Sequence, residues 1–302
     1  MLVRISVVMT TYNGEKYIGQ MLDSIRTQTR LVDEVLILDD CSKDNTVKFV
    51  TDYIERYQLS GWKIIVNQKN VGWKRNFKNG LEMATGDVIF LSDQDDNWHA
   101  DKIEKMTAAF EKNQNIWLLA SQVSVFTEEA GINTDMVEVR TEADGKVIFD
   151  YNYYVVKRPG CSMAMRKDIL EIFFRIWNED MPHDAALWSI ANLLGKLYIY
   201  DEPLIDYRKH EGNVTNKLAH DVHQALNSPE RTKIINEWYL SSEYVDEKKK
   251  PIVEYCTQWC MCRSELIRKK KLSAFFKAFK YRKCYSNIKR YFGDLYYYTQ
   301  KL

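Results

Sequence analysis

Short hydrophobic runs alternate with amphipathic segments along much of the chain. The runs are rich in β-branched and aromatic residues, which is typical of buried strands. They predict strands at residues 3–9, 34–38, 62–66, 88–91 and 116–126. Apolar residues at helical spacing predict helices around 17–25 and over 46–57, 75–84 and 100–113. Strands that alternate with helices imply right-handed crossovers, so the pattern predicts an α/β protein with a mostly parallel, Rossmann-like sheet.

The fourth predicted strand runs directly into three carboxylates, Asp93, Asp95 and Asp96. They should project from the carboxyl end of the strand, which is where open α/β sheets bind ligands. Acidic side chains this close repel one another, and the usual compensation is a hard divalent cation with oxygen ligands, often shared with a diphosphate. A solvated acidic turn is the alternative that this segment alone leaves open.

The loops after the first, second and fourth strands should face the same side of a parallel sheet, which brings Tyr12, Asp40 and Asp95 to one cleft. Such a cleft suits a nucleoside diphosphate, because Asp39 and Asp40 can accept hydrogen bonds from a ribose or a base imide and Tyr12 can stack. The alternative for the two aspartates is a turn that caps the next helix. The sequence contains neither GxGxxG after the first strand nor GxxxxGK[ST], so the dinucleotide and P-loop interpretations lack their fingerprints.

Composition and the first residues of the chain indicate where in the cell the protein is expected. No run approaches the ~20 apolar residues of a membrane span, and the start MLVRISVVMTTYN is a strand pattern and not a signal peptide. We therefore expect a cytoplasmic protein. Its six cysteines lack the paired spacing of a zinc site and should stay reduced, with Cys256, Cys260 and Cys262 on one helix face.

Four segments, TTYNGEKYI, LDDCSKDNT, NVGWKRNFKNGLEMATGD and SDQDD, stand in an order and spacing that resemble the inverting family 2 glycosyltransferases. The resemblance covers residues 1–215 and implies a nucleotide-binding glycosyltransferase A-type fold. It implies that Asp95 ligates Mg²⁺ or Mn²⁺. One departure is Phe77-Lys78, where many members carry Arg-Asn, so Arg75 and Asn76 are expected to take over that diphosphate-side role. The nucleoside would be held by Thr11, Tyr12, Asn13, Asp40 and Asp93.

Residues 157–166 and 181–188 look like the acceptor-side elements of the same family, and Asp184 falls at the position of its general base. A plain helix cap is the alternative for Asp184. Residues 201–215 look like the closing motif in its rhamnosyltransferase-like form. There Arg208 suits the diphosphate and His210 suits the metal, because they offer donors and a ligand nitrogen. The polar stretch 127–153 is expected to be a lid or an acceptor loop.

The region 216–302 is expected to be a separate helical, basic extension, with helical segments at 231–244, 251–270 and 273–298. Between Arg263 and Arg290 there are eleven Lys or Arg residues against the single Glu265. Aromatic residues interleave with these charges, a combination that suits an anionic membrane surface. Nucleic acid is the rival partner and a solvated helical bundle is the neutral alternative. Because family 2 enzymes commonly glycosylate lipid-linked acceptors, we expect peripheral attachment to the inner face of the cell membrane and no nucleic acid.

The resemblance implies an inverting enzyme that moves a sugar from dTDP-rhamnose or a UDP-hexose to a hydroxyl of a glycan or lipid-linked acceptor in cell-surface polysaccharide synthesis. A sugar nucleotidyltransferase is a second possibility, but it normally has a Gly-rich loop with Lys or Arg after the first strand, which TTYNGEKYI lacks. A nucleotide-sugar-binding module without turnover is the third, and the intact Asp93, Asp95 and Asp184 argue against it.

Overall fold

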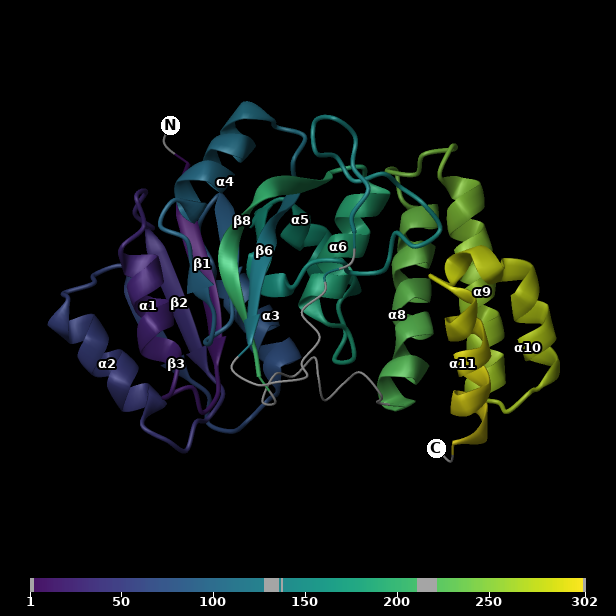
Figure 1. The fold of residues 1–302 in the computed structure, drawn as a ribbon, viewed down its shortest axis with the longest axis horizontal. Helices are drawn as coiled ribbons and strands as arrows, with labels where there is room; N and C mark the ends of the chain where they lie inside the picture. The colour runs from purple at the N-terminus through teal and green to yellow at the C-terminus, as the bar shows by residue number, and fades with distance from the viewer. Residues whose placement is uncertain (1–2, 128–135, 137, 211–221, 301–302) are drawn as a thin grey trace.

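The computed structural model describes residues 3–127, 136, 138–210 and 222–300. Within these ranges one sheet of eight strands has the order β3-β2-β1-β4-β7-β6-β8-β5 (Figure 1). The strands are β1 Ile5–Thr11, β2 Glu34–Asp39, β3 Trp62–Val66, β4 Val88–Ser92, β5 Asn97–Trp98, β6 Leu118–Thr127, β7 Met163–Arg166 and β8 Leu197–Lys209. β1 to β4 are mutually parallel, whereas β7 is antiparallel to both of its neighbours and β5 is antiparallel to β8. The predicted α/β class is confirmed, with a mixed sheet that is parallel in its first half.

The predicted strands and helices of the first half lie within a few residues of their expected places. β1 differs most: it extends to Thr11, because Thr10 and Thr11 still pair in register with Leu38 and Asp39 of β2. The helices are α1 Ile18–Arg26, α2 Thr46–Arg56, α3 Trp73–Met83, α4 Lys102–Lys112, α5 Ile169–Ile176, α6 His183–Leu193, α8 Val222–Ser241, α9 Lys250–Ile267, α10 Ser273–Ala278 and α11 Ile288–Thr299, with 3₁₀ turns η1 Gly160–Ser162 and η2 Phe279–Cys284.

The helical segment predicted at 273–298 is not continuous. α10 passes into η2, where Tyr281 leaves the helical region, and α11 begins anew after Asn287. Asn287 is extended and its side-chain oxygen accepts a hydrogen bond from the backbone N–H of Arg290 at 3.0 Å. An Asn in this position is a favoured helix N-cap, which explains the break.

Two buried cores lie on opposite faces of the sheet. α1, α2 and α4 pack on the face to which Val7 and Met9 of β1 point. α3, α5 and α6 pack on the other face, and the buried cluster there continues without interruption through Trp188 of α6 to Tyr239 of α8 and on to α9–α11. Figure 1 shows these C-terminal helices stacked beside α5 and α6. The expected boundary at 215/216 lies outside the described residues, so the division into two domains stays a prediction.

Part of the stretch expected to be a lid or acceptor loop, 127–153, also lies outside the described residues. The portion before α5 that is described packs on the body of the protein: Lys146 bridges to Tyr198 of β8, and Tyr153 is buried with its hydroxyl donated to Asn236 of α8. Tyr153 thereby connects the C-terminal helices to the sheet.

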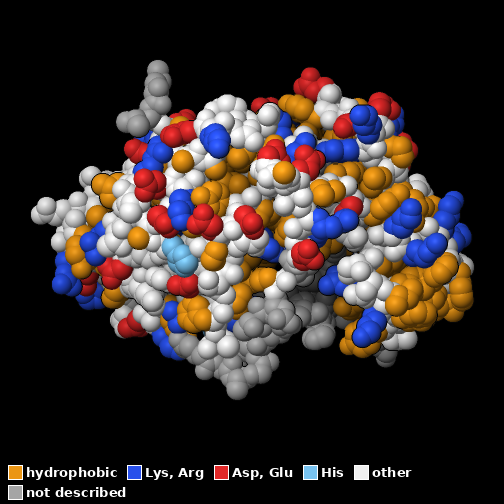
Figure 2. Space-filling model, turned by 45° about the horizontal axis from the view of Figure 1, so that its top comes forward, with side chains coloured by type: hydrophobic (Ala, Val, Ile, Leu, Met, Phe, Trp, Pro, Cys, Tyr) orange, Lys and Arg blue, Asp and Glu red, His pale blue; other side chains and the backbone are white. Residues whose placement is uncertain are grey.

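The outer surface of the C-terminal helices is unusually apolar. Figure 2 shows a broad hydrophobic patch on this side of the molecule with Lys and Arg side chains near it. Phe276 is 70% exposed and Phe292 56% exposed. The three cysteines of α9, Cys256, Cys260 and Cys262, are all buried as free thiols. None of the helices in the described ranges combines the length and the apolar character needed to cross a membrane.

Two helical glycines give a direct test of this packing. A Cβ at Gly80 of α3 would lie 2.5 Å from Val8 Cγ1 in β1, whereas a Cβ at Gly293 of α11 would have no neighbour within 4 Å. Gly80→Ala should therefore destabilise the fold by about 1–3 kcal/mol through overpacking. Gly293→Ala should stabilise it by about 0.5–1 kcal/mol, the ordinary gain in helix propensity. Urea unfolding of both variants measures the difference, and equal stabilisation by the two would contradict the close approach of α3 to β1.

Candidate functional site

A cavity of about 570 Å³ opens at the carboxyl ends of β1, β2 and β4. Because these strands are parallel neighbours, the loops that follow them meet at one edge of the sheet. Most of the residues predicted for the site line this cavity, namely Thr11, Tyr12, Asp40, Asn76, Asp93, Asp95, Asp184 and His210. Asn13, Arg75 and Arg208 lie outside the lining.

The carboxylate of Asp40 organises the loop that leads into α3. It accepts hydrogen bonds from the backbone N–H groups of Val71 and Gly72, both at 2.8 Å, and from the side-chain amide of Asn67 at 3.0 Å. It is buried and does not cap α2, whose cap residue is Asn45. Asp40 therefore shapes the cavity wall, and nucleoside binding by it stays a prediction.

Asn76 and Arg75, which were expected to replace the missing Arg-Asn pair, lie in different environments. Asn76 is buried and donates its amide to the carbonyl of Leu38 at 2.8 Å, while its side-chain oxygen accepts from Asn67. Arg75 points to the surface and forms a two-pronged ion pair with Glu179. This pair joins positions far apart in the chain, and no local pattern indicated it.

Asn13 and Arg208 lie outside the cavity lining and form hydrogen bonds with the loops around it. The side chain of Asn13 accepts from the N–H of Lys43 at 2.8 Å and its own N–H donates to Ser42 Oγ, which joins the loops after β1 and β2. Arg208 is buried and donates to the carbonyl of Asp95 and to Gln20, both at 2.8 Å. Arg208 therefore holds the loop that carries Asp93, Asp95 and Asp96, and Asn13 holds the loops after β1 and β2 together.

The three carboxylates after β4 occupy different environments. Asp93 and Asp95 are partly buried and line the cavity, whereas Asp96 is fully buried and lies outside the lining. One oxygen of Asp96 accepts from the N–H of Arg208 at 2.9 Å, and the other has no hydrogen-bond partner among the described residues. Burial, reinforced by repulsion from the neighbouring carboxylates, raises the pKa of Asp93 well above its usual value and the pKa of Asp96 to about 7.

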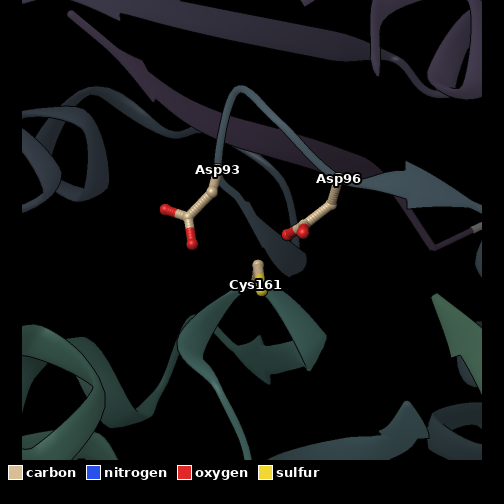
Figure 3. Close-up of side chains that lie close together, drawn as sticks. All are labelled: Asp93, Asp96 and Cys161. Carbon is tan, nitrogen blue, oxygen red and sulfur yellow. The ribbon is translucent and has the colours of Figure 1, made fainter. Parts of the chain in front are cut away.

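Cys161 of η1 lies between these two aspartates (Figure 3). One oxygen of each carboxylate and the Cys161 sulfur lie within 4.8 Å of one another. Burial and the two carboxylates raise the pKa of the Cys161 thiol, so it stays protonated and is a poor ligand for a hard cation. The thiol therefore lies beside both acids as a neutral group.

Lys102 adds a buried positive charge near Asp96 and Cys161. This side chain is completely buried, with its Nζ 3.4 Å from the Cys161 carbonyl and 4.8 Å from the centre of the Trp98 ring. Burial lowers the pKa of Lys102 to about 8. Lys102 was not among the residues predicted for the site, although its position four residues before Met106 on the apolar face of α4 was a usable signal.

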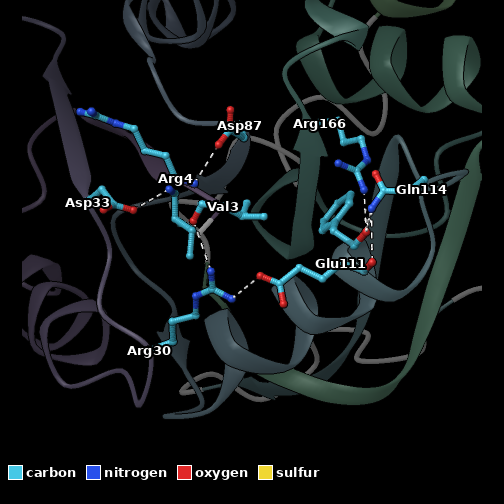
Figure 4. Close-up of polar contacts among 10 residues, drawn as sticks. Val3, Arg4, Arg30, Asp33, Asp87, Glu111, Gln114 and Arg166 are labelled. Atoms are coloured by element: carbon cyan, nitrogen blue, oxygen red, sulfur yellow. Dashed lines mark hydrogen bonds and ion pairs between the residues drawn. The ribbon is translucent and has the colours of Figure 1, made fainter. Parts of the chain in front are cut away.

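Acidic residues at the opposite edge of the sheet are each satisfied by a partner (Figure 4). Asp33 accepts from the N–H of Ile5 at 2.7 Å, Asp87 accepts from the N–H of Arg4 at 2.9 Å, and Glu111 pairs with Arg30 at 3.0 Å. Structural carboxylates in this fold thus find donors. The carboxylates at the carboxyl ends of the strands differ from these, because they lie close to one another, and they fit a site for a cation.

The two residues predicted to hold the metal contact each other. Asp95 Oδ2 lies 2.9 Å from His210 Nε2, and both line the cavity beside Asp93. Carboxylate oxygens and an imidazole are suitable ligands for Mn²⁺, and carboxylates for Mg²⁺. The residues present therefore fit the predicted cation, which would relieve the repulsion between Asp93 and Asp95.

On the acceptor side, Asp184 is the second residue of α6 and accepts from the N–H of Ala185 at 2.8 Å. Pro182 occupies the cap position, so Asp184 is not the helix cap. The preceding residue, His183, stacks on Phe77 with ring centres 3.8 Å apart. Both of its ring nitrogens are buried without a partner among the described residues, and burial lowers its pKa to about 4. The sequence offered no signal for His183 beyond its position beside Asp184.

Comparison with known proteins places the chain among sugar-transferring enzymes. The model of glycosyl transferase family 2 matches residues 6–173. The dTDP-rhamnosyl transferase RfbG of Shigella flexneri is 30% identical over 221 residues, which cover 68% of this chain and 72% of that protein. An uncharacterized glycosyltransferase of Haemophilus influenzae is 27% identical over 251 residues, covering 81% of this chain and 76% of that protein.

Two solved structures share the fold. S. aureus TarS in complex with UDP-GlcNAc has a TM-score of 0.66 at 19% identity and covers 92% of this chain and 79% of that one. The mannosyltransferase PcManGT from Pyrobaculum calidifontis, in complex with GDP-Man and Mn²⁺, has a TM-score of 0.56 at 15% identity. The match covers 98% of this chain and 85% of that one. The predicted nucleotide-binding α/β fold with a C-terminal helical extension is thereby confirmed.

Proposed function

The chain belongs to glycosyl transferase family 2, and from this premise we propose that it transfers a sugar from dTDP-rhamnose or a UDP-hexose, with inversion, to a hydroxyl of a glycan or lipid-linked acceptor in cell-surface polysaccharide synthesis. The observation that carries the proposal is the arrangement of acids in one cavity. Asp93 and Asp95 lie on one side and Asp184 on the other, all in the lining. Burial and repulsion from Asp96 and Asp95 raise the pKa of Asp93, and Asp184 is close enough to raise it further.

In the proposed complex the nucleoside lies over the β1 and β2 loops. Tyr12 is 45% exposed and can stack on a base, and Thr11 and Asp40 border the same end of the cavity. Asp93 also contributes to holding the nucleoside, and the diphosphate lies near Asp95, with Arg208 behind the loop and His210 beside it. Asp95 and His210 would hold Mn²⁺ or Mg²⁺, and such a cation neutralises the negative charge that develops on a leaving diphosphate.

The acceptor hydroxyl approaches from the side of α6. Asp184 accepts its proton as the hydroxyl oxygen attacks the anomeric carbon, and the bond from that carbon to the diphosphate breaks on the opposite face. One base and no protein nucleophile are sufficient for this single displacement. The helix amino terminus and the Ala185 N–H hold the carboxylate in position.

The choice of donor rests on the relatives and on the sequence motifs. The similarity to a dTDP-rhamnosyl transferase, together with the segment 201–215, supports dTDP-rhamnose, while the fold shared with a UDP-GlcNAc complex keeps UDP-hexoses in consideration. Membership of a glycosyltransferase family argues against the nucleotidyltransferase alternative. A module without turnover would bind the donor but release no nucleoside diphosphate.

Asp184→Asn tests the catalytic base. Asparagine keeps the shape and the oxygen that accepts from Ala185, but it cannot take a proton, and general-base catalysis is typically worth about 10²–10⁴ in rate. Turnover of the preferred donor should fall by that factor while donor affinity, measured by calorimetry, stays nearly constant. Asp168→Asn, an exposed acid at the start of α5, is the matched control and should be unchanged. Near-normal turnover in Asp184→Asn, or a product that retains the donor's anomeric configuration, would rule out this assignment.

We also propose that the apolar outer surface of α10, η2 and α11 docks on an anionic membrane. Phe276, Phe279 and Phe292 are exposed there, and buried Phe275 and Tyr291 pack against all three, so the three form one patch. The exposed bases of this region are Arg268, Lys269, Lys271, Lys277, Lys280, Arg282, Lys283, Lys289 and Arg290. Exposed aromatics beside many cations suit a negatively charged lipid surface better than nucleic acid.

Point variants test this surface better than truncation, because α10 and α11 also bury Phe275 and Tyr291 in the core. Lys277→Ala with Lys280→Ala should weaken binding to phosphatidylglycerol vesicles about thirtyfold, since each cation near the surface contributes about 1 kcal/mol. Phe276→Ala should weaken it further, and added salt should weaken it in the unmodified protein. Leu31→Ala, an exposed apolar residue far from these helices in the sequence, is the control. Vesicle binding that ignores the variants and the salt would show that this patch has another purpose.

A further inference from the structure

The residue between the two cavity aspartates, Gln94, makes a set of contacts that the proposed function does not use. Its side-chain oxygen accepts hydrogen bonds from the Thr11 hydroxyl at 2.6 Å and from the Tyr12 N–H at 2.9 Å, and its amide nitrogen donates to the Tyr12 carbonyl at 3.2 Å. One primary amide thus pairs with both backbone groups of a single residue, as a neighbouring strand would.

The surroundings leave little room for Gln94 to move. A Cβ at Gly14 would lie 2.3 Å from the Gln94 side-chain oxygen and 2.9 Å from the Thr11 hydroxyl. Residue 14 therefore has to be a glycine for the amide to reach β1. The close fit between Gly14, Thr11 and Gln94 fixes the loop that carries Asp93 and Asp95, here called the acidic loop, to the loop after β1.

Tyr12 needs such a support. It follows the last residue of β1, is 45% exposed, and its ring lines the cavity at the end where we place the base. An exposed ring in a loop loses conformational freedom when it stacks on a ligand, and this loss reduces affinity unless the backbone is already held. The Gln94 amide holds the backbone of Tyr12 at both its donor and its acceptor.

We propose, on the basis of the proposed function, that Gln94 is a positioning residue that orients the Tyr12 ring for stacking on the nucleobase of the donor. The same side chain ties the Tyr12 loop to the loop that carries Asp93 and Asp95. In this role the glutamine acts through the Tyr12 ring and does not touch the reacting atoms.

A double-mutant cycle on nucleotide affinity tests this role. The dissociation constants of UDP and dTDP are measured by calorimetry in Mn²⁺ buffer for the unmodified protein, Gln94→Ala, Tyr12→Ala and the double variant. Gln94→Ala should weaken binding of the preferred nucleotide about tenfold, the cost of ordering a free side chain. In the Tyr12→Ala background the same change should have almost no effect, because the ring that it orients is gone. In the Tyr12→Phe background, which keeps a stacking ring, the tenfold loss should persist.

Two further variants separate positioning from folding. Gln94→Glu keeps the side-chain length and both accepted hydrogen bonds but places an oxygen against the Tyr12 carbonyl, so it should also weaken nucleotide binding. Gln114→Ala is the matched control, because Gln114 donates to backbone carbonyls at the opposite edge of the sheet and should leave affinity unchanged. Thermal unfolding of each variant checks that the fold is retained.

An equal loss from Gln94→Ala in the unmodified protein and in the Tyr12→Ala background would overturn the inference, because Gln94 would then act through the acidic loop. No loss in the unmodified background would overturn it as well. Neither result touches the proposed function, since the protein would still bind the nucleotide. Failure of the unmodified protein to bind either nucleotide would overturn both.

Discussion

Mutual repulsion among the carboxylates that follow β4 is the constraint on which the site depends. Asp93 and Asp95 line one cavity, and Asp96, the next residue along the loop, is buried. Moving a charge out of water is costly unless it is paired, so burial raises the pKa of Asp93 and Asp96. Among the described residues, the buried Lys102 and the backbone N–H of Arg208 offset part of this cost. The negative charge that remains on these carboxylates fits a site for a cation.

The rest of the molecule holds this unfavourable cluster in place. Parallel pairing of β1 with β2 and β4 fixes the strand ends, and the paired acids at the opposite edge, such as Asp33 and Asp87, secure the start of β1. α6 brings Asp184 to the far wall, and the core behind α6 continues into α8 and α9. The C-terminal helices are therefore part of the support of the cavity wall that carries Asp184.

Much of the fold and the position of the cavity could be predicted from the sequence, because both follow from local patterns. Strand and helix periodicity placed Tyr12, Asp40 and Asp95 at one edge, and the structure agrees. Contacts between distant segments could not be predicted in this way. The pairing of Arg75 with Glu179 and the burial of His183 depend on side chains that meet only after folding. The break before α11 was not predicted, although Asn287 is a local cap signal.

The most direct test of the account is the metal dependence of donor turnover. Release of nucleoside diphosphate from dTDP-rhamnose and from UDP-hexoses is measured with acceptor extract, first with Mn²⁺, then with excess EDTA, and again after Mn²⁺ is restored. We predict that one donor is turned over, that EDTA abolishes this turnover reversibly, and that Asp95→Asn removes most of it even with Mn²⁺ present. Full turnover in excess EDTA together with an active Asp95→Asn variant would contradict the claim that these carboxylates hold a cation for the leaving diphosphate.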